Sequence, residues 1–522
     1  MNASQRIFVI VQALILICCC TLLANAQDEQ LRNLGNLERA GYQDFYAKRY
    51  DVAIETFSKA LEIAKQIENK EHLIYCYVSR LQAYVSSNKY AEVIKDASSI
   101  ISIISIMEGQ DKQKYVVQAF ASKGNAYNQL KNYDSAVVTY LTAIERFPTV
   151  LEFSNGLVWN LLFKKDFRGA IEQGTKALKI NIDTTQFPMN PKIYITGNLA
   201  HAYLMVGQFD SAKVLYLKYK GAYLNDKLWE NTIVNDFVEF RQNGIKSNDF
   251  VRVERLLLPK GEYASVDAAL LESKECITLN LSGQNLKTLP SEFIKLTNLE
   301  ELYLTQNPDL NWENVFVLLG KLPKLKTLIL ANNNIKNIST EISLLQNLEV
   351  LGIGLNQGLN LRKGLLFLAK LPKLTTLNLS FCMIEELPVE ISMLKNLRSL
   401  YLANNWYMNW KSAFQNLSAL PNLKTLAIAS NQIGDFPEEI TQLQNLEELD
   451  CHVNAIQWNN VLPKLRKMPK LKSMVLDVND LREMWGIEDL QNLEKLSLKN
   501  NLFSDAEQKR IQEKIPKCKV SF

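Results

Sequence analysis

The C-terminal half of the chain carries a leucine pattern whose copies follow one another at two alternating steps. Each copy reads LxxLxL, so its last two leucines alternate with another residue, which predicts a short half-buried strand. The steps between the middle leucines are 23, 26, 23, 26, 23, 26 and 23 residues, then 25 and 22. A period in this range predicts stacked coils around a continuous core. The middle positions are Leu279, Leu302, Leu328, Leu351, Leu377, Leu400, Leu426, Leu449, Met474 and Leu496.

The longer coil pattern, LxxLxLxxNxL, is clearest in segments 299–307 and 397–405. This pattern resembles the leucine-rich repeat. The resemblance implies an α/β solenoid of about ten repeats over residues 276–503, with its leucines pointing inward and a parallel sheet on the concave face. Residues 261–275 and 504–522 are then expected to cap the two ends, because end repeats need a cover.

An asparagine recurs at one turn position of the coils. There a buried amide can satisfy backbone groups that the bend leaves without partners. Gln284 and Cys382 take its place in two coils, so we expect a weaker ladder at both. The asparagines at this position are Asn307, Asn333, Asn356, Asn405, Asn431, Asn454 and Asn501.

The two step lengths reflect two kinds of coil. One kind continues with an LPxEI-like segment, as at 289–293 and 387–391, whereas the other continues with a tryptophan and a longer apolar stretch. We expect a convex-side helix in the second kind, for example over Val315–Leu322. Because Leu361 fills the tryptophan position in one coil, we expect these tryptophans to pack under the helices. They are Trp312, Trp410 and Trp458.

Between residues 31 and 260 the apolar positions follow a helical period and also repeat. In the best copy, Gly124 and Tyr127 are followed by Ala136, Tyr140 and Ala143. These residues resemble the tetratricopeptide repeat, in which small residues lie where two helices cross and an aromatic residue fills the space beside them. The resemblance implies an all-α superhelix of five to six hairpins over residues 27–260.

The first 26 residues are typical of a targeting segment. Arg6 precedes a mostly apolar stretch, Ile7–Leu23, and Ala24–Ala26 has the small-x-small form of a cleavage site. We therefore expect an exported protein, in the periplasm, at the cell surface or outside the cell, that is cleaved after Ala26. A retained membrane anchor and a lipid anchor at Cys18–Cys20 are the alternatives.

Charge and cysteine content limit the classes of partner and of site that the chain is expected to have. The 522 residues contain 59 Lys+Arg and 55 Asp+Glu, a formal charge of +4 that argues against nucleic-acid binding. We expect contact with a membrane only at the N-terminal segment. The remaining cysteines lack metal-site spacing and are expected to be core residues; they are Cys76, Cys276, Cys382, Cys451 and Cys518.

No catalytic motif emerges from the sequence. The chain has three histidines, and it shows no GxSxG, HExxH or phosphate-binding glycine loop. Because nearly all of residues 27–522 are repeat, no segment is left for a catalytic domain. We therefore expect no enzymatic activity, no cofactor and no bound metal.

Candidate binding residues lie where the repeats would expose them. Tyr303 and Tyr401 take the central outward position of their strands, and tyrosine is favoured in protein interfaces. Asp450 and His452 lie two residues apart on one strand face and could bind a cation or polar ligand, or simply be solvated. In the helical half, Asn125 and Asn128 could hydrogen-bond an extended peptide.

These features favour an interaction scaffold that binds proteins or peptides through two solenoid surfaces. The alternative is a surface adhesin or receptor that binds glycan or host matrix through the leucine-rich face. The oligomeric state and the identity of the partner are not encoded in these patterns.

Overall fold

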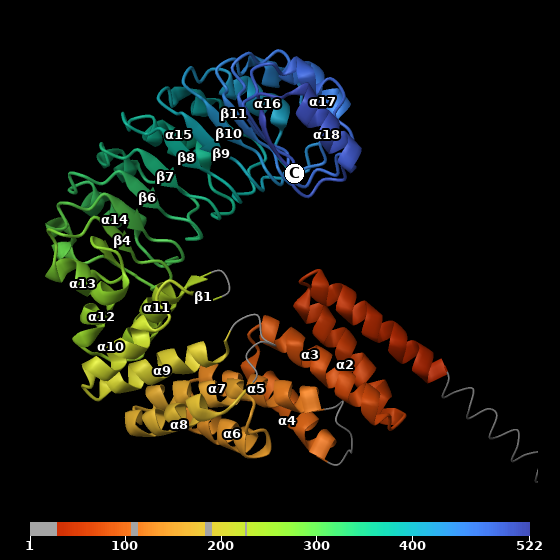
Figure 1. The fold of residues 1–522 in the computed structure, drawn as a ribbon, viewed down its shortest axis with the longest axis vertical. Helices are drawn as coiled ribbons and strands as arrows, with labels where there is room; N and C mark the ends of the chain where they lie inside the picture. The colour runs from red at the N-terminus through yellow and green to blue at the C-terminus, as the bar shows by residue number, and fades with distance from the viewer. Residues whose placement is uncertain (1–28, 106–112, 183–189, 225–226) are drawn as a thin grey trace, which may run out of the picture. The chain divides into compact units, whose positions relative to one another are not determined.

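The computed structural model describes residues 29–105, 113–182, 190–224 and 227–522 (Figure 1). The chain divides into two compact units, Met1–Val253 and Glu254–Phe522, which we call the helical unit and the sheet unit. The predicted signal segment, with its cleavage site and Cys18–Cys20, lies outside the described residues. Every helix among the described residues is too short or too polar to cross a bilayer.

The helical unit is a series of helices joined by short turns. Its first five helix pairs are hairpins, and α11 and α12 follow a small two-stranded turn. The elements are a helix at 29–46, α2 (Tyr50–Gln66), α3 (Lys70–Ser86), α4 (Tyr90–Ser105), α5 (Gln113–Gln129), α6 (Tyr133–Arg146), α7 (Leu151–Phe163), α8 (Phe167–Lys179), α9 (Lys192–Met205), α10 (Phe209–Leu217), β1 (Tyr223–Leu224), β2 (Lys227–Leu228), α11 (Trp229–Gln242) and α12 (Asp249–Leu257), whose residues 254–257 belong to the sheet unit.

Glycines allow the helices of a hairpin to approach closely. A Cβ on Gly124 would lie 2.4 Å from the ring of Tyr140, and a Cβ on Gly156 would lie equally close to the same ring. In the first hairpin, Gly41 and Phe57 form the equivalent pair. The predicted arrangement, a small residue at the crossing with an aromatic ring beside it, is therefore confirmed.

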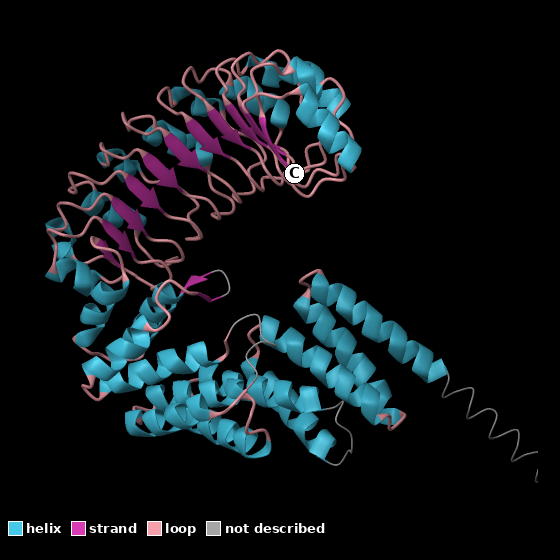
Figure 2. Ribbon diagram, viewed as in Figure 1, coloured by secondary structure: helices cyan, strands magenta, loops and turns pink. Residues whose placement is uncertain are grey.

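The sheet unit contains one twelve-stranded, wholly parallel sheet in strict chain order (Figure 2). The middle leucines pair with one another across the sheet, for example Leu351 with Leu377 and Leu377 with Leu400. The strands are β3 (Glu262–Tyr263), β4 (Thr278–Asn280), β5 (Glu301–Tyr303), β6 (Thr327–Ile329), β7 (Val350–Gly352), β8 (Thr376–Asn378), β9 (Ser399–Tyr401), β10 (Thr425–Ala427), β11 (Glu448–Asp450), β12 (Ser473–Val475), β13 (Lys495–Ser497) and β14 (Lys519–Ser521).

Coils alternate between a 3-10 helix and an α-helix after the strand. The 3-10 helices are η3 (Ser291–Lys295), η4 (Thr340–Leu344), η5 (Val389–Met393), η6 (Glu438–Gln442) and η7 (Ile487–Asp489). The α-helices are α14 (Trp312–Leu319), α15 (Leu361–Leu368), α16 (Trp410–Leu417) and α17 (Trp458–Leu465). Proline precedes η3, η5 and η6, and fixes the extended backbone at their N-caps.

The helix expected over Val315–Leu322 begins and ends three residues earlier, at Trp312 and Leu319. It begins there because the Asn311 side chain caps it, accepting a hydrogen bond from the backbone N–H of Asn314. Each helical tryptophan is thus the first residue of its helix. Trp458 is buried, whereas Trp312 and Trp410 are half-buried.

Both ends of the sheet carry a strand that lacks the leucine pattern. At the N-terminal end, β3 precedes the short helix α13 (Val266–Leu271), whose N-cap is Ser265. At the C-terminal end, α18 (Asp505–Lys514) is followed by β14. The caps therefore extend the sheet at both edges.

The asparagine ladder is present and runs between neighbouring coils. The Asn405 amide donates to Leu379 O and Leu402 O at 3.1 and 3.0 Å, and its Oδ1 accepts from the Ile384 N–H at 3.0 Å. Asn479, which was not predicted from the sequence, has the same role: its amide donates to Cys451 O and Leu476 O, and its Oδ1 accepts from the Ile456 N–H. At Cys382 the corresponding contact is a sulfur–carbonyl contact of 3.6 Å to Ile353 O, so the ladder is weaker there as expected.

The five cysteines among the described residues are free and buried. Burial raises the pKa of the Cys276 thiol to about 12 and that of Cys382 to about 11. These thiols therefore stay protonated at neutral pH and pack as small apolar residues.

Candidate functional site

The two predicted asparagines of the helical unit lie on α5, and both already hydrogen-bond within the unit. Asn125 Oδ1 accepts from the Tyr140 hydroxyl at 2.7 Å. Asn128 donates through Nδ2 to Asn160 Oδ1 at 2.9 Å, and Asn160 in turn donates to Gly156 O. Their side chains therefore link neighbouring helices in addition to facing solvent.

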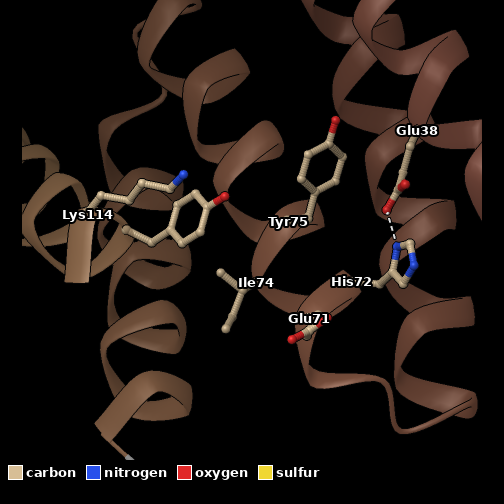
Figure 3. A pocket seen from close by; sticks show the side chains of 7 residues that line it. Glu38, Glu71, His72, Ile74, Tyr75 and Lys114 are labelled. Atoms are coloured by element: carbon tan, nitrogen blue, oxygen red, sulfur yellow. Dashed lines mark hydrogen bonds and ion pairs between the residues drawn. The ribbon is translucent and has the colours of Figure 1, made fainter. Parts of the chain in front are cut away.

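A cavity of about 400 Å³ opens between the helix at 29–46, α3 and α5 (Figure 3). Glu38 Oε1 accepts from His72 Nδ1 at 2.8 Å, and Lys114 approaches from the neighbouring helix with its ammonium group 4.9 Å from the Tyr115 ring centre. Burial, followed by the nearby Tyr42, raises the pKa of Tyr75 far above its usual range. Because this cavity combines acidic and basic side chains, it does not select one charge on a ligand.

The predicted tyrosines of the sheet unit lie at equivalent positions, as the last residues of β5 and β9, and are half-buried. Tyr303 donates through its hydroxyl to Glu301 Oε2 on the same strand at 3.1 Å. Burial, followed by this hydrogen bond, raises the pKa of Tyr303. Among the described residues, no hydrogen bond to the Tyr401 hydroxyl is present, so it can serve a ligand.

Asp450 and His452 are brought together at the end of β11. His452 Nδ1 lies 2.7 Å from Asp450 Oδ1, which also accepts from the His452 backbone N–H at 3.2 Å. Among the described residues, no group of three or more His, Cys, Asp or Glu side chains is positioned to hold a metal ion. The pair therefore forms a polar end to the strand surface.

Between β5 and β11 the outward strand positions carry no charge. Three such positions in each of the coils of β6 to β10 form what we call the strand face. Its residues are Thr327, Ile329, Ala331, Val350, Gly352, Gly354, Thr376, Asn378, Ser380, Ser399, Tyr401, Ala403, Thr425, Ala427 and Ala429. Charged residues flank it, with Glu301 on β5 and Glu448 on β11.

Large apolar side chains cluster at one edge of the strand face, where the strands end. We call this cluster the rim patch. Its five residues come from three successive coils and are between 44% and 68% exposed: Leu355, Phe381, Met383, Trp406 and Tyr407. Exposed apolar side chains that gather in this way mark interaction sites more often than scattered ones.

The rim patch is not required by the fold. The residue four positions after each middle leucine has a positive φ, between 52° and 70°, in all ten coils. Asparagine or glycine is the residue that this conformation tolerates best, and Asn332, Asn404 and Asn500 follow the rule. Leu355 and Phe381 of the rim patch do not, with φ of 58° and 60°, and neither do the residues at this position in four other coils, Gln306, Ser430, Val453 and Val478.

The rim patch was not predicted from the sequence, although the sequence contains a signal for it. Residues 332–334 read Asn-Asn-Asn, and the equivalent positions 49 residues later read Phe-Cys-Met. The first and third of these three positions have positive φ in both copies. The replacement of three turn-favouring residues by three apolar ones therefore distinguishes this coil.

The comparison with protein families agrees with the repeat predicted for the helical unit. The tetratricopeptide-repeat family model matches residues 117–149, which lie in the hairpin of α5 and α6. Residues 117–149 are a tetratricopeptide repeat. The neighbouring hairpins repeat the same helix pairing, and the sheet unit is a leucine-rich-repeat solenoid, as the sequence predicted.

Solved structures similar to this chain include two internalins and one leucine-rich-repeat protein. An internalin from Listeria monocytogenes is 22% identical over 53% of this chain and 77% of its own, with a TM-score of 0.36. A leucine-rich-repeat protein from Leptospira interrogans is 22% identical over 50% and 99%, with a TM-score of 0.19. Internalin C2 from L. monocytogenes is 23% identical over 44% and 84%, with a TM-score of 0.26. No curated protein matches the chain.

Proposed function

We propose that this chain is a non-enzymatic interaction scaffold whose sheet unit docks another polypeptide on the strand face and rim patch. The observation that carries the proposal is the rim patch itself, because five large apolar side chains are exposed in adjacent coils. Three of them, Leu355, Phe381 and Met383, have a positive φ that favours asparagine. Trp, Tyr, Phe and Met are the residues enriched at protein interfaces.

The adjoining strand face indicates the chemistry of the partner. Because the strand face carries no charged side chains, covering it does not bury unpaired ions. It therefore suits an uncharged partner surface with apolar anchors. A glycan partner would not require five exposed apolar side chains, and we treat it as the alternative that the experiment must separate.

The test uses the full-length protein and a double variant, Phe381→Asn with Met383→Asn. Both positions have positive φ, so asparagine is tolerated there and the variant is expected to fold. The proteins are immobilised, exposed to an envelope extract of the native host and crosslinked. We expect partner crosslinks around the strand face, and at least tenfold less captured protein with the double variant, about 1.4 kcal/mol.

The control is Val389→Asn, which removes an exposed apolar side chain from η5 on another part of the same coil. It should capture as much partner as the unchanged protein. Capture that the double variant does not reduce contradicts the proposal. Capture that is lost only after periodate oxidation of the extract's glycans supports the adhesin alternative instead.

We also propose that the chain is exported and cleaved after Ala26, on the basis of the segment Arg6–Ala26. N-terminal sequencing of the protein from its host should then begin at Gln27. A sequence that begins at Met1 contradicts the proposal, and one that begins at a lipid-modified cysteine supports the lipid-anchored alternative.

A further inference from the structure

A separate cavity of about 230 Å³ lies among α7, α9 and α11 of the helical unit. Trp159, Tyr194 and Trp229 supply aromatic walls. Trp229 is buried and held in place, since its indole N–H donates to Tyr216 O at 2.7 Å. The volume lies below the roughly 300–1,000 Å³ of sites that take drug-sized molecules, so the cavity suits a single side chain.

One lining residue of this cavity is charged, and it is acidic. Asp236 Oδ2 lies 3.0 Å from His201 Nε2, and His201 Nδ1 lies 2.8 Å from the Tyr216 hydroxyl. His201 is completely buried. A neutral imidazole satisfies both contacts, with Nε2–H donating to Asp236 and Nδ1 accepting from Tyr216.

These buried hydrogen bonds hold the Asp236 carboxylate in place, and a neutral imidazole does not cancel its negative charge. Burial raises the pKa of Asp236, whereas the hydrogen bond with His201 acts in the opposite direction and does not cancel the effect of burial. Among the residues that line the cavity, no cation lies beside Asp236. A ligand that brings a positive charge would therefore be attracted strongly in this partly buried setting.

Two amides line the same cavity. Asn198 is buried and donates through Nδ2 to Asn155 Oδ1 at 2.8 Å. Among the described residues, Asn198 Oδ1 and Asn155 Nδ2 have no further hydrogen bond. They offer one acceptor and one donor to the backbone of a ligand.

We propose that this cavity binds the alkylammonium side chain of a lysine in an extended peptide. The lysine stem would lie against Trp159 and Tyr194, and the ammonium group would be held between these aromatic rings and Asp236. The two amides would then hold the peptide backbone beside it. This site lies on the helical unit and is independent of the docking surface proposed for the sheet unit.

The test measures direct binding of capped peptides to the full-length protein by isothermal titration calorimetry, with saturation-transfer NMR for weak binding. The probe is acetyl-Gly-Gly-Lys-Gly-Gly-amide, and its partners carry norleucine or glutamate in place of lysine. Norleucine has a similar stem without the charge. We expect the lysine peptide to bind at least about tenfold more tightly than either of the others.

Asp236→Asn provides the matched variant. The asparagine oxygen still accepts from His201, so the fold is retained while the charge is lost. Lysine-peptide binding should weaken about tenfold, and norleucine-peptide binding should not change. Glu239→Gln is the control, because it removes a carboxylate from the same helix outside the cavity.

Three outcomes would overturn the proposal: no binding of the lysine peptide, equal or tighter binding of norleucine or glutamate peptides, or lysine binding that Asp236→Asn leaves unchanged. The rim-patch double variant should bind the lysine peptide normally. Failure of the docking surface and failure of this cavity therefore give different results.

Discussion

At the scale of single residues, the sheet unit accepts backbone strain where it exposes apolar side chains. Val453 and Val478 share the left-handed position of Phe381, with φ of 52° and 57°, and both are exposed. A β-branched residue is least suited to this conformation, because its Cβ substituents crowd the backbone. Neither local conformation nor burial accounts for valine here.

We expect Val453→Asn and Val478→Asn each to raise the free energy of unfolding of the sheet unit by about 1 kcal/mol, because asparagine tolerates positive φ. Urea denaturation followed by circular dichroism measures the change. Val475→Asn is the control, since Val475 lies in the regular strand β12, where asparagine is disfavoured. If Val453→Asn and Val478→Asn destabilise the unit as much as Val475→Asn does, the strain argument is wrong.

Asn405 and Cys382 occupy the same ladder position in neighbouring coils, so each residue can be replaced by the other as a test. Asn405→Cys leaves Leu402 O and the Ile384 N–H buried without good partners and should cost about 1–3 kcal/mol. Cys382→Asn should restore the amide contacts that the sulfur makes at 3.6 and 3.7 Å, and thus stabilise the unit. Denaturant midpoints compare the two variants, and equal effects in the same direction would contradict the assigned role.

At the scale of elements, hairpin packing depends on glycines that helix propensity alone would disfavour. Gly124→Ala should stabilise the helix by about 1 kcal/mol through its higher helix propensity, but it places a Cβ 2.4 Å from the Tyr140 ring. We expect a net loss of about 1–3 kcal/mol from overpacking. The backbone amide hydrogens of α5 and α6 should then exchange faster with solvent, and hydrogen-exchange experiments measure this rate.

Gly35→Ala is the matched control for this substitution. Gly35 also lies inside a helix, but a Cβ there would have no neighbour within 4 Å. This variant should be neutral or slightly stabilising. If Gly124→Ala behaves in the same way, the close helix approach does not limit stability.

The elements that could be predicted from the sequence are those that repeat. Strands β4 to β13 are centred on the ten leucine-type positions, because each coil buries the same face against its neighbours. Strands β3 and β14 could not be predicted, since a cap pairs through its backbone and needs no leucine pattern. Asn479 was missed because an irregular step of 25 residues and Met474 obscure the ladder there.

The candidate sites were harder to predict for a different reason. Tyr401 could be placed on the strand face because strand alternation determines which side chains point outward. The hydrogen bonds that link Tyr216, His201 and Asp236 join three helices, so they depend on how those helices pack. Helical periodicity within one segment does not contain that information.

At the scale of the whole molecule, stability in a repeat protein comes from contacts between neighbouring modules. Each coil of the sheet unit pairs only with the strand before it and the strand after it. A defect in one coil therefore acts first on the two adjacent coils and then fades with distance. This behaviour differs from that of a globule with one shared core.

Leu377→Ala tests this directly. Leu377 is completely buried in β8, and its truncation should cost about 2–5 kcal/mol from lost burial and the cavity left behind. Hydrogen exchange measured by mass spectrometry should accelerate most in the coils of β7, β8 and β9, and progressively less toward β4 and β13. Uniform acceleration across the sheet unit would instead indicate that it unfolds as one cooperative block, in which case docking at the rim patch would stabilise every coil equally rather than the three coils that carry it.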